Sequence, residues 1–380
     1  MGRLVNRLSQ YWNRIQGSLF PWLEEELDPL TEKQQQLVMI LELVRIEQFL
    51  PNYWGFEGRP QKDRSAIARS FVAKMVYNMN TTVCLLERLK TDKNLRRICG
   101  WESCYQIPSE ATFSRAFTDF AVSNLPGKVH HALIENSLKG EIVLHSSKDS
   151  TAIEAREKPH LKRKKKADIP KKKGRPKKGE KKQEKELTRI EKQGSMTLEE
   201  MLNDLPKHCD KGAKKDSKGN VMYWNGYKLH LATIDSGIPV SAIVTSASLH
   251  DSQVGIPLMK MTAEKIINCY DLMDSAYDVP AIYDYSKSLG HVPLIDKNPR
   301  KNKELKKAIA NETKARKVLN FDYPESIRYN ERSTAERANA RMKDEFGAQK
   351  VRVRGHIKVS CHLLFGVLVL AADQLMRLVT

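Results

Sequence analysis

The sequence predicts an α/β protein in which a helical N-terminal region precedes a mixed β-sheet flanked by helices. Three observations support this fold class. Apolar residues recur at helical spacing through the first third of the chain. Apolar runs of strand length alternate with helical stretches after it, and one strongly basic segment interrupts that second part. A chain of 380 residues has room for two or three domains.

Residues 1–138 are predicted to form a helical domain. Residues 30–46 and 63–77 carry apolar residues at helical spacing. A further helix is predicted after Pro108, with Ser109 as its N-cap.

The helix after Ser109 follows a helical stretch at 83–98, and the pair resembles a helix-turn-helix arrangement. In such an arrangement Thr112 and Arg115 would face a DNA groove. The alternative is that this helix is simply one member of a helical bundle.

The second part of the chain, residues 139–355, is predicted to contain the sheet. Residues 141–149 are an apolar run followed by polar residues, which predicts a strand that ends near Asp149. Residues 222–235 and 238–245 alternate as strands around the turn Asp235-Ser-Gly237, so they predict a hairpin.

The elements after the hairpin complete the pattern. We expect a helix at 251–267, a short strand ending at Asp274, a helix at 280–289 and a strand at 291–297. The order of strand, hairpin, helix, strand, helix, strand and helix matches a ribonuclease-H-like fold. In that fold Asp149 and Asp274 lie on neighbouring strands. Residues 356–380 are predicted to form a last, amphipathic helix that packs on this domain.

Residues 156–220 form a basic insertion between the first strand and the hairpin. Its segment 161–183 holds 13 Lys and Arg residues against 2 acids, more than half of the net charge of +19. So little apolar content cannot build a core, so we expect a flexible arm. Gly174-Arg-Pro176 flanked by lysines resembles an AT-hook, which enters the minor groove of A·T-rich DNA. A solvated basic tether is the alternative.

Composition favours a polyanionic partner, because 65 Lys and Arg face 46 Asp and Glu. No run of 18 apolar residues exists, so we expect no membrane span. The six cysteines lack Cys-x-x-Cys spacing, which favours reduced thiols in the cytoplasm over a zinc site. No phosphate-binding Gly-x-x-x-x-Gly-Lys loop is present, so nucleotide hydrolysis is unsupported.

Four polar residues near the C-terminal end carry the chemistry: Tyr329, Arg332, Glu336 and Lys343. On a continuous helix, at about 100° per residue, all four lie on a stripe about 60° wide. A carboxylate there can hold a divalent metal, and the two cations can hold phosphate oxygens. An exposed helix with i,i+4 ion pairs is the alternative.

This spacing of Tyr, Arg, Glu and Lys resembles the signature of DDE transposases of bacterial insertion sequences, in the insertion-sequence-four and -five superfamily. Asp149-Ser-Thr resembles the first acidic motif of that family, and Asp274-Ser-Ala-Tyr277 resembles the second. Four neighbouring acids are alternative candidates for these motifs: Asp271, Asp278, Glu331 and Glu345.

The resemblance implies a catalytic triad of Asp149, Asp274 and Glu336 that binds two Mg²⁺ or Mn²⁺ ions. A metal pair would clamp an in-line phosphoryl transfer. The implied activity is cut-and-paste transposition. The enzyme would bind terminal inverted repeats, hydrolyse the phosphodiester bond at each transposon end and join the 3′-OH ends to target DNA.

The same resemblance implies double-stranded DNA as the partner, in a prokaryotic, nucleoid-associated setting, with a homodimer that holds two ends. Residues 1–138 would then bind ends or dimerise, although the basic insertion remains an alternative reader. The residues expected to contact DNA are Tyr329, Arg332, Lys343, Lys173, Arg175, Lys177 and Arg115.

Two other functions remain open at this point. A non-catalytic DNA-binding protein derived from a transposase would bind DNA without metal-dependent nicking. A ribonuclease-H-like nuclease would cut DNA without joining strands.

Overall fold

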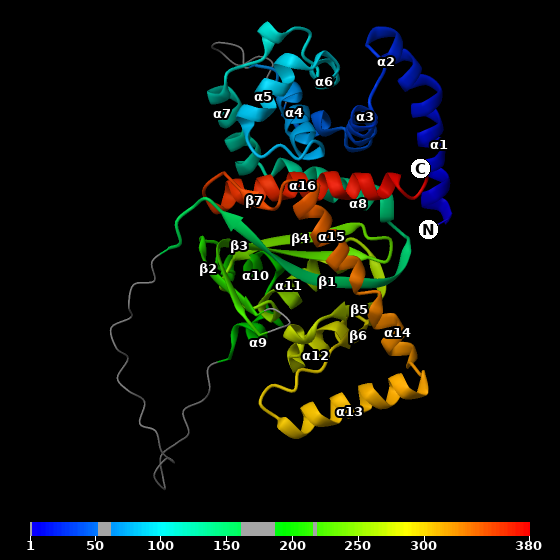
Figure 1. The fold of residues 1–380 in the computed structure, drawn as a ribbon, viewed down its shortest axis with the longest axis vertical. Helices are drawn as coiled ribbons and strands as arrows, with labels where there is room; N and C mark the ends of the chain where they lie inside the picture. The colour runs from blue at the N-terminus through cyan, green and yellow to red at the C-terminus, as the bar shows by residue number, and fades with distance from the viewer. Residues whose placement is uncertain (1, 52–61, 161–186, 216–218) are drawn as a thin grey trace.

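The computed structural model describes residues 2–51, 62–160, 187–215 and 219–380. A helical region lies on one side of a mixed sheet, and one long helix runs between the two (Figure 1). The helical region consists of α1 (Gly2–Arg14), η1 (Ile15–Leu19), α2 (Phe20–Glu26), α3 (Glu32–Val44), η2 (Ile46–Phe49), α4 (Arg64–Val76), α5 (Thr82–Thr91), α6 (Lys93–Ile98), η3 (Cys104–Gln106), α7 (Glu110–Val122) and α8 (Leu125–Leu138).

The predicted helices of this region are confirmed, and their starts follow local capping chemistry. Thr31 and Gln34 form a capping box at the start of α3. The Asp63 side chain accepts two backbone N–H groups at the start of α4. Ser109 precedes α7 as expected, but its side chain makes no capping hydrogen bond. Instead its hydroxyl lies 3.3 Å from the hydroxyl of Thr112.

The sheet has the order β2-β3-β1-β5-β6, with β4 beside β3 and β7 beside β1. Its strands are β1 (Ile142–Ala155), β2 (Asp210–Lys215), β3 (Val221–Ile234), β4 (Pro239–Ser246), β5 (Ile267–Met273), β6 (Val292–Ile295) and β7 (Lys350–Val351). The predicted hairpin is β3–β4, with Gly237 at a φ of 75° in its turn. β1 pairs antiparallel with β3 and parallel with β5, so the first strand lies at the centre of the sheet.

The remaining helices lie against this sheet or extend from it. They are α9 (Arg189–Gln193), α10 (Leu198–Asp204), α11 (Ser252–Ala263), η4 (Ser275–Tyr277), α12 (Pro280–Ser288), α13 (Lys303–Leu319), α14 (Pro324–Asn330), α15 (Ser333–Asp344) and α16 (His356–Met376). The predicted helices at 251–267 and 280–289 correspond to α11 and α12, and the predicted strand at 291–297 is β6.

The basic insertion is more structured near its C-terminal end than the sequence suggested. The expectation was that the fold resumes at Val221. Instead α9 and α10 each begin with a capping box, and Asp210–Lys215 pairs antiparallel with β3. The sequence does not predict β2 as a strand, because β2 is mostly exposed and carries three lysines in six residues. The most basic stretch, 161–183, lies outside the described residues.

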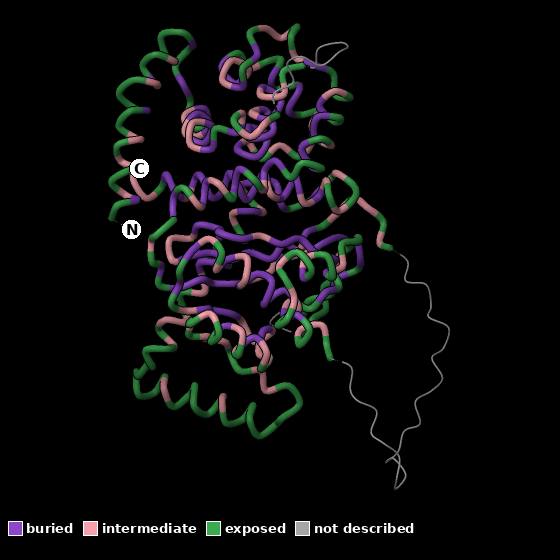
Figure 2. The backbone as a smooth tube through the Cα atoms, turned by 180° about the vertical axis from the view of Figure 1, so that it is seen from behind, coloured by how far each residue is buried: buried purple, intermediate pink, exposed green. Residues whose placement is uncertain are grey.

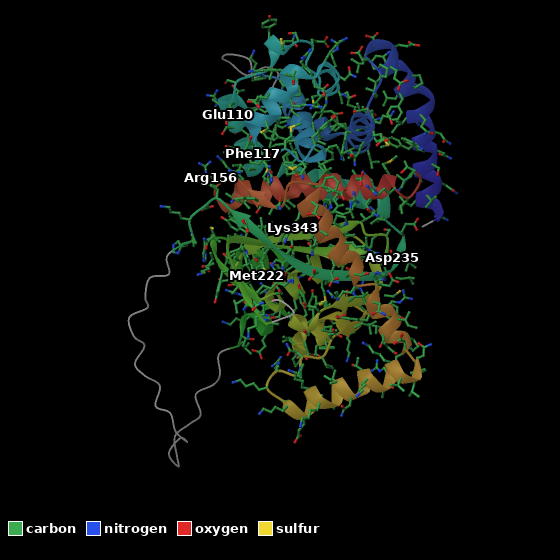
Figure 3. The ribbon with its side chains drawn as sticks, viewed as in Figure 1. Glu110, Phe117, Arg156, Met222, Asp235 and Lys343 are labelled. Atoms are coloured by element: carbon green, nitrogen blue, oxygen red, sulfur yellow. The ribbon has the colours of Figure 1, made fainter. Side chains whose placement is uncertain are left out.

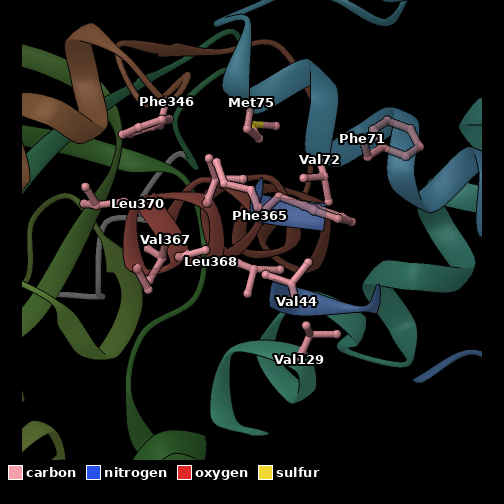
Figure 4. Packing of buried hydrophobic residues seen from close by; sticks show 14 of the residues in the cluster. Val44, Phe71, Val72, Met75, Val129, Phe346, Phe365, Val367, Leu368 and Leu370 are labelled. Carbon is pink, nitrogen blue, oxygen red and sulfur yellow. The ribbon is translucent and has the colours of Figure 1, made fainter. Parts of the chain in front are cut away.

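α16 forms the centre of the hydrophobic core. The prediction of an amphipathic helix was wrong, because α16 is buried on nearly every side and not along one stripe (Figure 2). It is the one helix within the described ranges that is long and apolar enough to cross a membrane, but 83% of that apolar window is buried inside the protein. Phe365 packs on Phe71 of α4 (Figure 4). It also stacks on Phe117 of α7.

The core runs without a break from the helical region to the sheet. A single cluster of buried apolar side chains includes Ile67 of α4, Val367 of α16 and Leu231 of β3. Polar contacts follow the same path, because Gln374 of α16 donates to the carbonyl of Ser236 at 2.9 Å. The helical region, α16 and the sheet are therefore built as one packed body.

Candidate active site

The sequence predicts that Asp149 lies at the end of a strand, but in the structure it lies in the middle of β1. The strand continues six residues beyond it, and Asp149 is paired in register with Leu231 of β3. The polar residues 147–149 resemble the end of a strand in the sequence, but they lie within β1 and make polar contacts on both faces of the sheet. Ser147 and Asp149 contact α15, whereas Lys148 reaches across the other face to β5.

Asp274 follows directly after β5, as predicted, and caps the short helix η4. Its carboxylate accepts the backbone N–H of Ala276 at 3.0 Å. The parallel register pairs Lys148 with Met273, the residue before Asp274. Asp149 of β1 and Asp274, directly after the adjacent strand β5, therefore lie at the same level of the sheet.

Burial and mutual repulsion act on both carboxyl groups. The pKa of Asp149 is raised to about 6, mainly by burial and in part by the negative charge of Asp274. Burial also raises the pKa of Asp274. A nearby cation stabilises the anionic form of two half-buried carboxyl groups whose pKa values are raised. The site therefore favours a positive charge between them.

The stripe of four polar residues is interrupted by a break in the helix. Tyr329 lies on α14, whereas Glu336 and Lys343 lie on α15. Arg332 stands between the two helices, where the hydrogen bonds tighten to i→i−3 spacing, as from the Arg332 N–H to the Tyr329 carbonyl. The condition of one continuous helix is therefore not met, although the backbone stays in the right-handed helical region.

Arg332 is the residue that the three acids share. Its guanidinium forms an ion pair with the Glu336 carboxylate. Its positive charge also lowers the pKa of Asp149 and of Asp274 against the stronger effect of burial. Glu336 lies in the first turn of α15 with its side chain 54% exposed. In this arrangement no three His, Cys, Asp or Glu side chains in the described ranges are placed to hold a metal ion together.

α15 is fixed over β1 by small residues and by two polar contacts. Ala335 and Ala338 are buried on its inner face, so the helix can approach the strand closely. The hydroxyl of Thr334 lies 3.3 Å from that of Ser147. The amide of Asn339 donates to Asp149 at 3.1 Å. Sequence reasoning missed Asn339, although its position one turn after Glu336 places both on the same face of a helix.

A fourth acid near the site was also missed. Asp251 precedes α11, and its carboxylate binds the ammonium of Lys228 at 2.8 Å. Burial would raise the pKa of Asp251, but the charges of His230 and Lys228 and a hydrogen bond from Ser150 lower it. The negative charge of Asp251 also raises the pKa of Asp274. The His-Asp-Ser sequence at 250–252 was visible, but only the fold brings it beside β1.

Three of the four competing acids, Asp271, Asp278 and Glu345, have other partners. Asp271 is buried and binds the ammonium of Lys148 at 2.6 Å. Asp278 accepts the backbone N–H of Asn298 at 2.9 Å. The guanidinium of Arg341 binds Glu345 on the side of α15 that faces α16.

Three buried polar atoms around the carboxylates have no hydrogen-bond partner among the residues that the structure describes. They are the Nε of Arg332, the hydroxyl of Tyr277 and the Oδ1 of Asn339. A buried donor or acceptor without a partner costs about 1–3 kcal/mol, so such atoms are rarely left in place without a use. Together with the oxygen-rich carboxylates, they fit a site for hard divalent cations and phosphate oxygens.

Comparisons with known families agree with this geometry. Residues 145–371 match the family model described as the transposase DDE domain. The chain belongs to the DDE transposases of insertion sequences. Residues 24–119 match a second model, described as a transposase domain (DUF772). Searches among curated proteins and among solved structures gave no match.

The match confirms the predicted family and the ribonuclease-H-like fold class of this transposase. The DDE model begins inside β1 before Asp149 and ends within α16, so it includes most of β1 and all of β5 and α15. Membership of the family implies DNA as the partner and divalent metal ions as the usual cofactor.

The residues that the sequence assigned to DNA contact lie in separate places. Tyr329 is half-buried on α14, and its ring lies 5.7 Å from the guanidinium carbon of Arg332. Lys343 of the transposase lies on α15 over the sheet (Figure 3), and burial lowers its pKa, with the charge of Lys214 adding to this effect. Arg115 is exposed on α7, which belongs to the helical region on the other side of α16 from the sheet (Figure 1). Lys173, Arg175 and Lys177 lie outside the described residues.

Proposed function

We propose that the transposase moves its element by cutting and pasting DNA, with Asp149, Asp274 and Glu336 as the catalytic and metal-binding triad. The observation that supports this most is the position of Arg332, which interacts with all three acids where β1, β5 and α15 meet. Divalent ions bound there, Mg²⁺ or Mn²⁺, would activate the attacking oxygen and stabilise the leaving one.

Within this proposal the protein side chains bind and orient the DNA. Arg332 turns from Glu336 to a phosphate oxygen beside the scissile bond, which frees Glu336 to complete the metal site. Lys343 binds a second phosphate on the same helix. Tyr329 packs beside the displaced nucleotide or donates a hydrogen bond to a phosphate.

On the DNA strand that is transferred, the reaction has two chemically similar steps. Water attacks the phosphorus at the transposon end, the bond to the 3′ oxygen breaks, and the freed 3′ oxygen takes up a proton. That 3′-OH then attacks a phosphorus of target DNA, a new phosphodiester bond forms and a target 3′ oxygen leaves. The number of phosphodiester bonds is unchanged in the second step, so no energy source is required. Joining two ends calls for two copies of the chain, and we propose a homodimer on DNA.

The test uses a duplex that carries the inverted repeats flanking the coding sequence of the protein itself. With Mg²⁺ or Mn²⁺ the wild type should produce nicked and then joined products, and chelation by EDTA should stop both. Asp149→Ala, Asp274→Ala and Glu336→Ala should each lower cleavage by about a thousandfold or more. Asp278→Asn and Glu345→Gln are matched controls from the same segments and should keep cleavage.

The outcomes separate the alternatives. Full cleavage by any of the three alanine variants would refute the triad. DNA binding without cleavage would identify a non-catalytic DNA-binding protein, and cleavage without joined products would identify a nuclease.

A further inference from the structure

The helix α13 stands apart from the rest of the molecule. None of its 17 residues is buried, and it extends beyond the sheet on the side opposite the helical region (Figures 1 and 2). A helix of this length without a buried face gains little stability from packing. Its position and composition therefore call for a function other than building the core.

Five exposed lysines lie on one face of α13. At about 100° per residue they fall within a stripe about 100° wide, and the stripe rises about 21 Å along the helix axis. We call them the lysine stripe: Lys303, Lys306, Lys307, Lys314 and Lys317. In the part of the chain that the structure describes, none of the five has an ion pair with a carboxylate.

The opposite face of α13 attaches the helix to α14. Arg316 donates to the hydroxyl of Ser326 at 3.0 Å, and its guanidinium carbon lies 4.4 Å from the ring centre of Tyr323. Glu312, one turn earlier, forms an ion pair with the same guanidinium. These contacts fix the rotation of the helix, so the lysine stripe points away from the protein.

The charge around α13 is strongly one-sided. Residues 300–319 contain eight Lys and Arg residues and two Glu. Five like charges on one helix face repel one another, which costs folding free energy unless a polyanion neutralises them. The length of the stripe corresponds to about six phosphates along one DNA strand. Charge and length together match a duplex backbone.

The position of α13 relative to the acids decides which part of a duplex it meets. α14 follows α13 in the chain and carries Tyr329, and α15 leads from there past Glu336 to α16 beneath the helical region (Figure 1). A duplex that lies along α15 with a phosphate at Arg332 would extend in one direction toward the helical region and in the other toward α13.

We propose that the lysine stripe binds the phosphate backbone of the DNA that flanks the transposon end, on the far side of the scissile bond from the helical region. The assignment rests on the proposed transposase function. It adds a surface that anchors the flanking duplex while the end is cut, through charge and without reading sequence.

The experiment compares two end duplexes that differ only in flank length, one with about 2 and one with about 20 base pairs beyond the cleavage site, because backbone contacts scale with the duplex available. The test variant is Lys306→Gln, Lys314→Gln and Lys317→Gln together, at exposed positions where glutamine keeps helix propensity. The matched control removes the same charge from exposed lysines of the helical region: Lys90→Gln, Lys128→Gln and Lys139→Gln. Contacts made to the end itself cancel in the affinity ratio of the two duplexes.

We expect the long flank to raise wild-type affinity about tenfold or more at low salt, with a steeper salt dependence than the short flank. The stripe variant should lose most of this gain, and the salt slope on the long flank should fall by up to about 0.9 for each lysine that contacts a phosphate. The control variant should keep the gain. Circular dichroism of the stripe variant verifies that the fold is retained.

A wild-type affinity ratio in the stripe variant would overturn the inference while leaving the proposed function in place, whether the two affinities are unchanged or fall equally. A wild type that neither binds nor cuts the end duplexes refutes the proposed function itself.

Discussion

The amide of Asn339 donates a hydrogen bond to the Oδ2 atom of Asp149 at 3.1 Å, so the helix that carries Glu336 also orients a carboxylate on the central strand. This contact joins α15 to β1 at the site. It lowers the pKa of Asp149, although burial outweighs it. An outer contact of this kind decides how a metal-binding carboxylate points.

Asn339→Ala should lower cleavage by about 10- to 100-fold and raise the metal concentration needed for half-maximal rate, because the Asp149 carboxylate loses its orienting donor. Cleavage rates over a Mg²⁺ titration measure this. Thr334→Val is the control, since it removes a neighbouring contact between the same helix and strand without touching Asp149. An unchanged metal requirement in Asn339→Ala would rule out this positioning role.

Asp251→Asn should raise the Mg²⁺ concentration for half-maximal cleavage about fivefold, which corresponds to roughly 1 kcal/mol of lost attraction for the cations. The reason is that the negative charge of Asp251 acts on Asp274 without belonging to the triad. The same titration measures it, with Asp278→Asn as the control. If both variants require the same metal concentration, Asp251 only supports the fold through Lys228.

Lys148→Met should destabilise the protein by about 3–5 kcal/mol, because it leaves Asp271 as a buried charge without its cation. Burial would raise the pKa of Asp271, yet Lys148 and hydrogen bonds from His291 and Ser286 hold it well below its usual range. Urea unfolding measures the loss. The double variant Lys148→Met with Asp271→Leu should recover part of it, whereas additive losses would show that the pair is not coupled.

Lys74→Met should raise the free energy of unfolding at pH 7 by up to about 3 kcal/mol. Lys74 is 4% exposed in α4, and burial lowers its pKa from 10.5 to about 8. Between these two pH values the folded protein binds fewer protons than the unfolded chain, so wild-type stability rises with pH across that window. The advantage of the variant should therefore shrink as pH rises from 8 to 10.5, which urea unfolding at several pH values measures. A constant advantage would contradict the lowered pKa.

The sequence predicted the elements whose patterns are local. The β3–β4 hairpin, α11, α12 and the strand before Asp274 each follow from periodicity and turn residues within a short window. Family recognition added the order of the three acidic motifs, which one helical wheel would not have established.

What the sequence did not predict depends on contacts between distant segments. Asp149 is mid-strand because β1 is covered on both faces, which no local pattern shows. α16 is buried all round because helices cover one side and the sheet covers the other. Asn339 is not an acid and so belongs to none of the three acidic motifs. Its contact with Asp149 forms only because α15 lies over β1. β2 is charged and is a strand only because β3 offers it an edge.

The central place of α16 also ties the stability of the two halves of the molecule together. The helical region and the sheet both pack their buried apolar side chains on this one helix. A substitution that loosens α16 therefore weakens both halves at once, and neither half keeps its core when the helix is displaced.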